Sequence, residues 1–276
     1  MKEKDRVDLR QMCKNMRMDC LIMAKAAAMQ GFHFGATLSI IEIVAVLYKK
    51  VLELDKDNLE SEKRDRFILS KGHGVPAIYA AWKEIGLLEE KELQTFKQNG
   101  TRLYAHPFRN VASGVEFSSG SLGQGLSFGV GSALGMKLKE NSSSKVYVLL
   151  GDGECDEGSI WEAAMSAVKY QLDNLVAIID WNQMQYDGAI EQVMPLSSLE
   201  DKWKSFGWKV VSVDGHDVEQ LYNALTKQYK VPMVVIAKTV KGKGVSFMEN
   251  NPSWHHGIMK KQEEQQAWKE VINIEL

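Results

Sequence analysis

The second half of the chain alternates between short apolar runs and segments with helical spacing. The runs are rich in Val, Ile and Leu and occupy residues 145–150, 175–180, 208–213 and 232–237. The helical patterns between them occupy residues 159–170, 198–206 and 217–229. Strands that alternate with helices form a parallel sheet, and near-continuous apolar runs indicate that helices cover both faces. The sequence therefore predicts an α/β fold with a doubly wound parallel sheet.

Helical patterns dominate the first half of the chain. They predict helices at residues 7–29, 39–52, 78–85 and 89–97, and one from a glycine-rich opening at 120–131 to about residue 140. Ser39 is the predicted N-cap of the second helix, with Glu42 in the capping-box position. A strand is expected at residues 66–69, and a polar helix at 260–271 after the loop 250–253. No linker or repeat separates these elements, so we expect residues 1–276 to form a single domain.

Composition excludes several classes of function. The chain has 276 residues with 45% hydrophobic content, a formal charge of −2 and a pI near 6.3, so it offers no basic patch to nucleic acid or an anionic membrane. The first ten residues are mostly charged, and Lys25 interrupts the apolar stretch 21–29, so neither secretion nor membrane insertion is indicated. Three cysteines without a CxxC pair suit a reducing compartment. We therefore expect a cytoplasmic protein.

The ends of two apolar runs carry the residues of a candidate ligand site. Gly151-Asp152-Gly153 follows the run 145–150, and Asn182 follows the run 175–180. Ligands bind at the carboxyl edge of parallel sheets, and glycines there let the backbone pass close to phosphate oxygens. One carboxylate, one amide oxygen and one backbone carbonyl, which we assign to Met184, suit the oxygen shell of Mg²⁺, or of Ca²⁺ or Mn²⁺ in its place. The sequence thus predicts a metal–diphosphate site.

This pattern resembles the thiamine diphosphate fingerprint, and further motifs narrow the family. In chain order they are Gly31-Phe32-His33-Phe34-Gly35, Leu69-Ser70-Lys71-Gly72-His73-Gly74, Ala105-His106-Pro107, Gly120-Ser121-Leu122-Gly123-Gln124-Gly125, Gly151-Asp152-Gly153-Glu154-Cys155-Asp156-Glu157-Gly158 and Asp214-Gly215-His216-Asp217. From about residue 10 to residue 260 the chain resembles the amino-terminal half of transketolase, although Phe stands on both sides of His33 where the family usually has Gly-His-Pro-Gly. The resemblance implies the diphosphate-binding (PP-type) fold and transfer of a two-carbon ketol unit between sugars, with thiamine diphosphate as electron sink.

The resemblance also implies which histidines surround the donor ketose and move protons, a task that suits a pKa near neutrality. They are His33, His73, His106 and one member of the pair His255 and His256. The segment Trp254-His255-His256-Gly257 aligns in two ways, with His255 as first choice and His256 as second. His216 is interpreted as structural, in a turn before a helix.

The expected cofactor contacts come from the same resemblance. Gly153 and Glu154 are expected to offer N–H groups to the diphosphate near a helix N-terminus, and Glu157 to reach across a subunit interface. The full set is His73, Gly120, Ser121, Leu122, Gly123, Asp152, Gly153, Glu154, Glu157, Asn182 and His255. Residues 241–244, Lys-Gly-Lys-Gly, either reach phosphate or form a surface loop.

One part of the family's site has no match in this chain. In transketolases the glutamate that activates the cofactor comes from a second, pyrimidine-binding half. The resemblance therefore implies a split enzyme: a separate polypeptide supplies that half in an α2β2 heterotetramer that acts on sugar phosphates. Two alternatives stay open. The α-subunit of a 2-oxo acid dehydrogenase would not need four histidines for polyol hydroxyls, and a non-catalytic module of the same fold would not need Asp152, Asn182 and Glu157.

Overall fold

A five-stranded parallel sheet forms the centre of the protein. The computed structural model describes residues 1–54, 56–139 and 143–275. The strands are β1 Arg66–Leu69, β2 Val146–Gly151, β3 Leu175–Trp181, β4 Lys209–Asp214 and β5 Met233–Lys238. They pair in the order β1-β2-β3-β5-β4, and every pairing is parallel. The predicted parallel sheet is confirmed.

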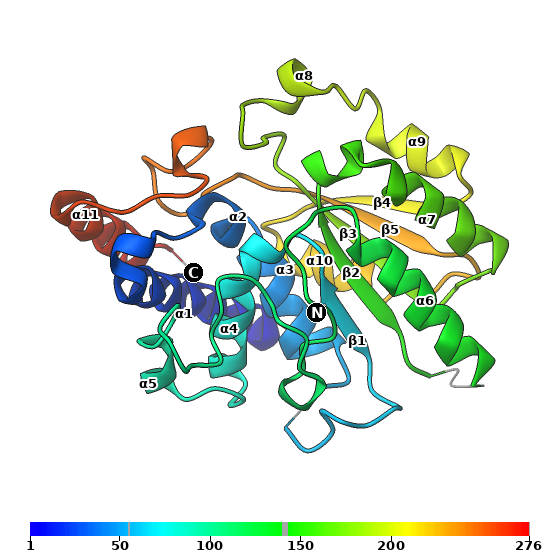
Figure 1. Cartoon of the computed structure of the whole chain (residues 1–276), viewed down its shortest axis with the longest axis horizontal. Coiled ribbons are helices and arrows are strands. Elements are labelled where there is room, and N and C mark those ends of the chain that lie inside the picture. The colour runs from blue at the N-terminus through cyan, green and yellow to red at the C-terminus, as the bar shows by residue number, and fades with distance from the viewer. Residues whose placement is uncertain (55, 140–142, 276) are drawn as a thin grey trace.

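Helices cover both faces of this sheet (Figure 1). One layer contains α1 Glu3–Ala27, α3 Ile41–Val46, α4 Val75–Glu84 and α10 Val218–Leu225, with α11 Lys261–Ile272 packed on α1. The other layer contains α6 Gly125–Leu138, α7 Gly158–Lys169 and α9 Leu199–Ser205. Short helices α2 Phe34–Leu38, α5 Glu90–Leu93 and α8 Ile190–Val193 lie in the connections. The doubly wound α/β class is therefore confirmed.

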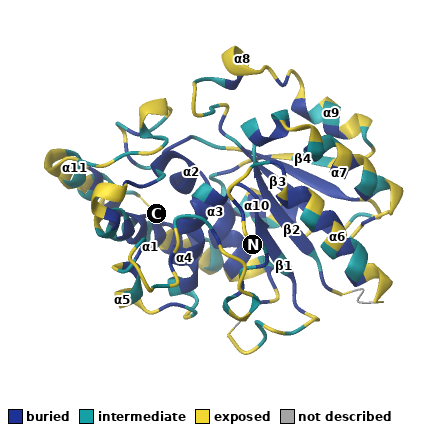
Figure 2. Ribbon diagram, in the orientation of Figure 1, coloured by how far each residue is buried: buried dark blue, intermediate teal, exposed yellow. Residues whose placement is uncertain are grey.

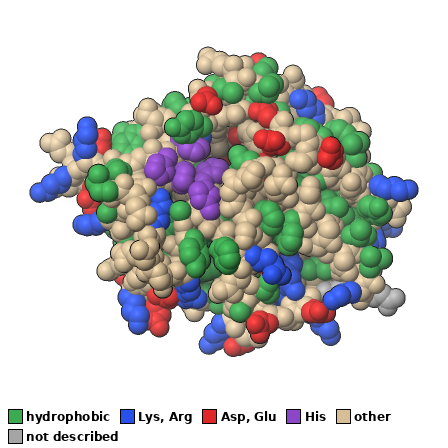
Figure 3. All heavy atoms as spheres, in the orientation of Figure 1, with side chains coloured by type: hydrophobic (Ala, Val, Ile, Leu, Met, Phe, Trp, Pro, Cys, Tyr) green, Lys and Arg blue, Asp and Glu red, His purple; other side chains and the backbone are tan. Residues whose placement is uncertain are grey.

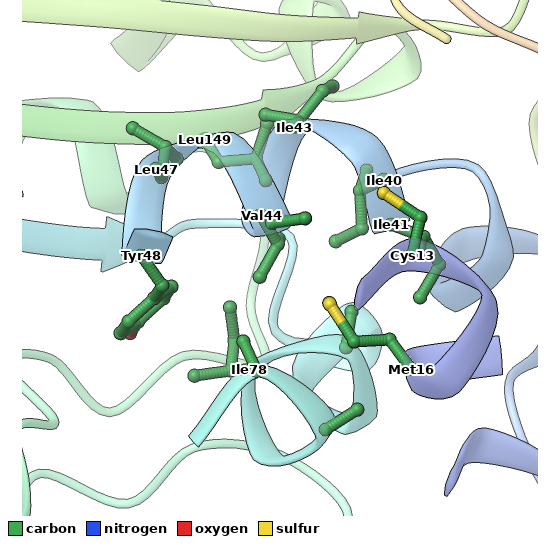
Figure 4. Packing of buried hydrophobic residues seen from close by; sticks show 14 of the residues in the cluster. Cys13, Met16, Ile40, Ile41, Ile43, Val44, Leu47, Tyr48, Ile78 and Leu149 are labelled. Atoms are coloured by element: carbon green, nitrogen blue, oxygen red, sulfur yellow. The ribbon is translucent and has the colours of Figure 1, made fainter. Parts of the chain in front are cut away.

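Side chains of the strands alternate between two hydrophobic clusters. On β2, Tyr147 and Leu149 belong to the cluster under α1, α3 and α4, whereas Val146, Val148 and Leu150 belong to the cluster under α6 and α7. This is the two-residue period of a strand, and it leaves no solvated face in the central strands (Figure 2). Figure 4 shows residues of α3 and of the turn after it stacked over Leu149. Burial on both faces explains the continuous apolar runs in the sequence.

The helix predicted at residues 39–52 is divided in the structure. Residues 39 and 40 form a turn after α2, and the rest of the range consists of α3 followed by a π-helical turn at Leu47–Val51. The predicted capping box is wrong: α3 follows Ile40, without a side-chain cap, and the Ser39 hydroxyl donates instead to Asp180 Oδ2 at 2.7 Å. Glu42 forms a 2.7 Å ion pair with Arg17. Buried polar groups require partners, and here the partners on other elements prevail over the local cap.

Other boundaries differ by smaller amounts. The helix predicted at 217–229 ends at Leu225, and α8 was not predicted. The helix α6 ends at Leu138, and residue 140, its predicted end, lies outside the described residues. Gly86, the predicted break between helices, has a φ of 79°. Among the described residues, no helix is long and apolar enough to cross a membrane.

A pair of identical substitutions tests the position of the core. Leu149→Ala removes a fully buried side chain from β2 and should lower the free energy of unfolding by about 2–5 kcal/mol. Leu138→Ala, on the exposed surface of α6, should change it by less than about 0.5 kcal/mol. Urea denaturation followed by circular dichroism measures both. Equal losses would contradict the proposed packing of β2.

Candidate functional site

A cavity of about 300 Å³ lies at the carboxyl edge of the sheet. The segments that follow β1, β2, β3 and β5 line it, together with loops that carry His33, His106 and His255. Figure 3 shows the histidine side chains gathered in one group on the surface. The structure thus brings together most of the predicted site residues, with four exceptions outside the lining: Ser121, Gly123, Glu157 and His256.

His33 lies at the centre of the histidine group. Its ring centroid is 5.5 Å from those of His73 and His106, 5.7 Å from His255 and 4.5 Å from His256. The backbone of Phe32 exchanges two hydrogen bonds with Gly257, at 2.9 and 3.0 Å, which fixes His33 against the loop that carries the last two histidines. Imidazoles therefore gather around His33, beside a space that a polyol chain can enter.

The two phenylalanines beside His33 do not face the cavity. Phe32 and Phe34 are each 1% exposed, and their rings lie 4.8 Å apart. Phe34 also packs edge-on against Trp254 at 5.5 Å. Their position in the core shows that they support the His33 backbone and do not contact a ligand in this cavity.

The structure distinguishes the two neighbouring histidines near residue 255. His255 lines the cavity, 5.2 Å from His73, whereas His256 lies over Gly31. A Cβ on Gly31 would be 2.5 Å from His256 Cε1, and this glycine has a φ of 67°, so any other residue there would be strained. Of the two, His255, the first choice from the sequence, is therefore the one that faces the cavity, and its catalytic role stays a prediction.

The histidines of the cavity are held neutral. Burial has the largest effect on His33 and the nearby histidines the next largest, and together they lower its pKa to about 3. Burial, and after it Lys241, lowers the pKa of His255 to about 4. The pKa values of His73, His106 and His256 are also lowered, first by burial. A neutral imidazole has one N–H donor and one acceptor, which suits exchange of protons with hydroxyl groups.

The predicted metal donors lie together at the floor of the cavity. Asp152 accepts hydrogen bonds from Gly153 N at 2.8 Å and from Gln183 N at 2.5 Å. Asn182 donates through Nδ2 to Asp180 at 2.9 Å, which turns its Oδ1 toward Met184 N at 3.1 Å. Among the described residues, no three His, Cys, Asp or Glu side chains gather as a metal cluster, so a cation here would have one carboxylate and neutral oxygens as ligands.

The charges around Asp152 fit a cation and an anionic group. Burial has the largest effect on Asp152 and Asp180 the next largest, and together they raise its pKa to about 7, because they outweigh the opposing effect of Lys71. A divalent cation would supply further positive charge. Lys241 Nζ donates to the Met184 carbonyl at 3.1 Å, and burial together with Lys71 lowers its pKa to about 8. Two buried lysines, Lys71 and Lys241, thus lie beside these oxygens, and such charges are suited to hold an anionic group such as a diphosphate.

The side chain of Glu154 has a structural role in addition to the backbone contact with a diphosphate, which stays a prediction. Its buried carboxylate accepts hydrogen bonds from the Ser70 hydroxyl, from Gly123 N at 2.8 Å and from Gly151 N at 3.0 Å. It therefore joins the turn before α6 to the ends of β1 and β2. The first helix after Asp152 is a 3₁₀ turn, Gly153–Asp156, and α7 begins only at Gly158.

Some neighbouring residues were not predicted, or their role was left open. Asp180, two residues before Asn182, ends an apolar run, and that position at the carboxyl edge was the signal that could have identified it. Tyr186 is 68% exposed, with its ring 5.2 Å from that of His255. Lys241, left open as a phosphate contact or a loop residue, is buried in the cavity. Glu157 is exposed, and its N–H donates to the carbonyl of Glu154, which lines the cavity; its contact across an interface stays a prediction.

His216 lies outside the cavity, as expected of a structural residue. Its Nδ1 is 2.9 Å from Glu42 Oε2, and its Nε2 accepts a hydrogen bond from Val240 N at 2.9 Å. Asp217 caps α10 by accepting from Glu219 N and Gln220 N.

Comparison with known proteins gives consistent matches. Residues 10–275 match the family model described as "Transketolase, thiamine diphosphate binding domain". An apulose-4-phosphate transketolase subunit of Phocaeicola vulgatus is 41% identical over 87% of this chain and 85% of its own length. The 6-deoxy-6-sulfo-D-fructose transketolase subunit SqwG of a Clostridium species is 42% identical over 87% and 86%. The crystal structure of transketolase from Campylobacter jejuni superposes with a TM-score of 0.86 and 28% identity, over 96% of this chain and 43% of that one.

Titration of the cavity histidines tests their neutral state. Because the folded pKa values of His33 and His255 lie far below the ordinary value of about 6.5, their Cε1–H signals should stay unchanged from about pH 8 to pH 5. The free energy of unfolding should fall as the pH drops below about 6.5, because the unfolded chain binds more protons. NMR of the folded chain measures the first effect and denaturation the second.

The control is the same chain in denaturant, whose histidines should all titrate near pH 6.5. A midpoint above about pH 6 for His33 in the folded protein would contradict the neutral cavity.

Proposed function

Since this chain belongs to the transketolase family, whose thiamine diphosphate-binding domain it carries, we propose that it is the diphosphate- and metal-binding subunit of a two-chain transketolase. It would transfer a two-carbon ketol unit from a ketose to an aldose. The match over residues 10–275 confirms the resemblance of the sequence motifs to this family. A 2-oxo acid dehydrogenase subunit is no longer needed as an alternative.

The observation that carries the proposal is the coincidence of two groups in one cavity. Neutral histidines centred on His33 line one part, and the oxygens of Asp152 and Asn182 line the floor. A polyol substrate needs several donors and acceptors near its hydroxyls, and a diphosphate needs a cation and phosphate-facing positive charge. A non-catalytic module has no physical reason to keep both.

We further propose that Mg²⁺, or Ca²⁺ or Mn²⁺ in its place, binds at Asp152, Asn182 and the Met184 carbonyl. The raised pKa of Asp152 and the adjacent neutral oxygens support this assignment. Lys241 would then leave the carbonyl of Met184, which it contacts at 3.1 Å, and turn to the diphosphate. When bound, thiamine diphosphate supplies the electron sink for cleavage of a carbon–carbon bond.

The residues of this chain would bind and orient the ligands around that group. Gly120, Leu122 and Gly153 form part of the wall, where the two glycines allow a ligand to approach the backbone closely. His73 and His255 are the cavity histidines on which Lys71 and Lys241 act most strongly, so we propose that they contact both cofactor and substrate. His33 and His106 would accept and donate protons at sugar hydroxyls, because each imidazole is neutral.

A separate subunit is proposed to complete the site. Two of the relatives carry "subunit" in their names, and this chain matches most of their length but less than half of a whole transketolase. Glu157 is exposed beside the cavity, where a second chain can reach it. We propose an α2β2 heterotetramer in which the second chain supplies the pyrimidine-binding half with its glutamate.

The remaining proposals concern substrate and compartment. The relatives are named for sugars that carry phosphate or sulfonate, so we propose sugar phosphates or similarly anionic sugars as substrates. A near-neutral charge supports neither nucleic acid nor a membrane as partner. All three cysteines are free and buried, which supports a cytoplasmic location.

Replacement of the metal ligand tests the function. With Mg²⁺ present, Asp152→Asn should weaken binding of thiamine diphosphate at least about 100-fold, because it removes the only anionic metal ligand. Asp173→Asn, at an exposed ion pair with Lys137, is the matched control and should leave affinity unchanged. Calorimetric titration of the chain together with its partner subunit measures both. Failure of the unaltered protein to bind the cofactor would overturn the proposal.

The two adjacent histidines give a second test. His255→Asn should lower kcat about 10²–10⁴-fold in ketol transfer, as expected for loss of a general acid–base group. His256→Asn should lower it less than about tenfold, because this side chain packs over Gly31 and does not line the cavity. The reverse ranking would assign the catalytic role to His256.

A further inference from the structure

The turn Asp214-Gly215-His216-Asp217 has no role in the proposed function, yet it contacts two segments that are far apart along the chain, α3 and the loop after β5. His216 follows β4, and its imidazole lies between Glu42 of α3 and the backbone of Val240 after β5. The Val240 N–H can only donate, so His216 Nε2 is the acceptor. The ring proton is therefore on Nδ1, which donates a hydrogen bond to Glu42. The imidazole therefore links α3 to the loop after β5.

Arg17 also connects Glu42 to the loop after β5. Arg17 of α1 pairs with Glu42 through Nη1 at 2.7 Å, and its Nε donates to the Lys243 carbonyl at 3.2 Å. Arg17 is 3% exposed and Glu42 is 7% exposed. Burial opposes ionisation of Glu42, yet Arg17 and His216 hold its pKa at about 2. Glu42 is thus ionised, and its two partners, Arg17 and His216, each hydrogen-bond to the backbone of the loop after β5.

Lys241 and Gly242 lie between these two attachment points. His216 accepts from the Val240 N–H and Arg17 donates to the Lys243 carbonyl, while the side chain of Lys241 lines the cavity. Its stem passes over Gly35, where a Cβ would lie 2.9 Å from two side-chain carbons of Lys241. Gly242 N donates to the Gly35 carbonyl at 3.2 Å. The loop is therefore fixed on both sides of one buried cation.

We propose that the chain of contacts Arg17–Glu42–His216 positions Lys241 for the diphosphate of the cofactor. This inference rests on the proposed function and extends it, because it assigns a role to three residues outside the cavity. They do not touch the ligand. They fix the backbone from which the lysine reaches it, so their loss reduces affinity only while the lysine is present.

A double-mutant cycle separates positioning from a general structural role. His216→Ala should weaken thiamine diphosphate binding in Mg²⁺ about tenfold when Lys241 is present, and less than about twofold in the Lys241→Met background. His216→Gln should restore part of the affinity, because its amide offers one donor and one acceptor in place of the ring nitrogens. Calorimetric titrations of the complex with the partner subunit supply the four affinities.

Asp217→Ala is the matched control within the same turn. It removes the N-cap of α10, where Asp217 accepts from Glu219 N and Gln220 N, but it does not touch Val240. It should lower the unfolding temperature and leave cofactor affinity within about twofold of the unaltered protein. If His216→Ala does not fold, Glu42→Gln replaces it in the cycle.

The outcomes distinguish this inference from the proposed function. Equal losses from His216→Ala in both lysine backgrounds, no loss in either, or an equal loss from Asp217→Ala would overturn the positioning role alone. Absence of cofactor binding by the unaltered protein would overturn the proposed function, and the inference with it.

Discussion

The buried carboxylate of Asp180 is the group on which the site depends. It is fully buried at the end of β3 and accepts hydrogen bonds from Ser39, Asn182 and Thr239 as well as the ammonium of Lys71. Burial alone would raise the pKa of Asp180, but Lys71 and the hydrogen bonds hold it below its ordinary value. Removal of one partner from such a buried pair costs about 3–5 kcal/mol. The ends of β1, β3 and β5 and the turn before α3 are therefore fixed by one anion, and the orientation of the Asn182 amide is fixed with them.

The sequence was sufficient for the sheet and for much of the site, because both depend on regularities along the chain. Apolar runs located the strands, and residues at the carboxyl ends of parallel strands, such as Asp152 and Asn182, necessarily share one edge. The predicted capping box of Ser39 and Glu42 failed for a reason that no local pattern contains. Both side chains found buried partners, Asp180 and Arg17, that are distant in sequence. Periodicity describes which face is buried, and it does not describe which buried charges pair.

Two glycines also show the difference between a local sequence pattern and a contact between distant residues. Gly31 and Gly35 are the first and last residues of the motif around His33, and the sequence alone assigns no role to either. The structure gives them different tertiary contacts: Gly31 makes room for His256, and Gly35 makes room for the stem of Lys241. These contacts join segments more than 200 residues apart along the chain, so no local pattern could have chosen between the neighbouring histidines or placed the lysine after β5.

The sheet topology has a consequence for how the protein forms. Every strand pairing joins segments far apart along the chain, as in Arg66 with Val146, and no hairpin is available among the described strands to start the sheet. Folds dominated by such non-local contacts form slowly, because loop closure must precede any gain from pairing. The cavity draws on segments from His33 to His255, so it exists only once nearly the whole chain is in place. A ligand that binds only the folded chain shifts the folding equilibrium and lowers the fraction of unfolded protein. If that ligand is thiamine diphosphate, as proposed, the supply of thiamine would then affect how much of the newly made protein escapes proteolysis.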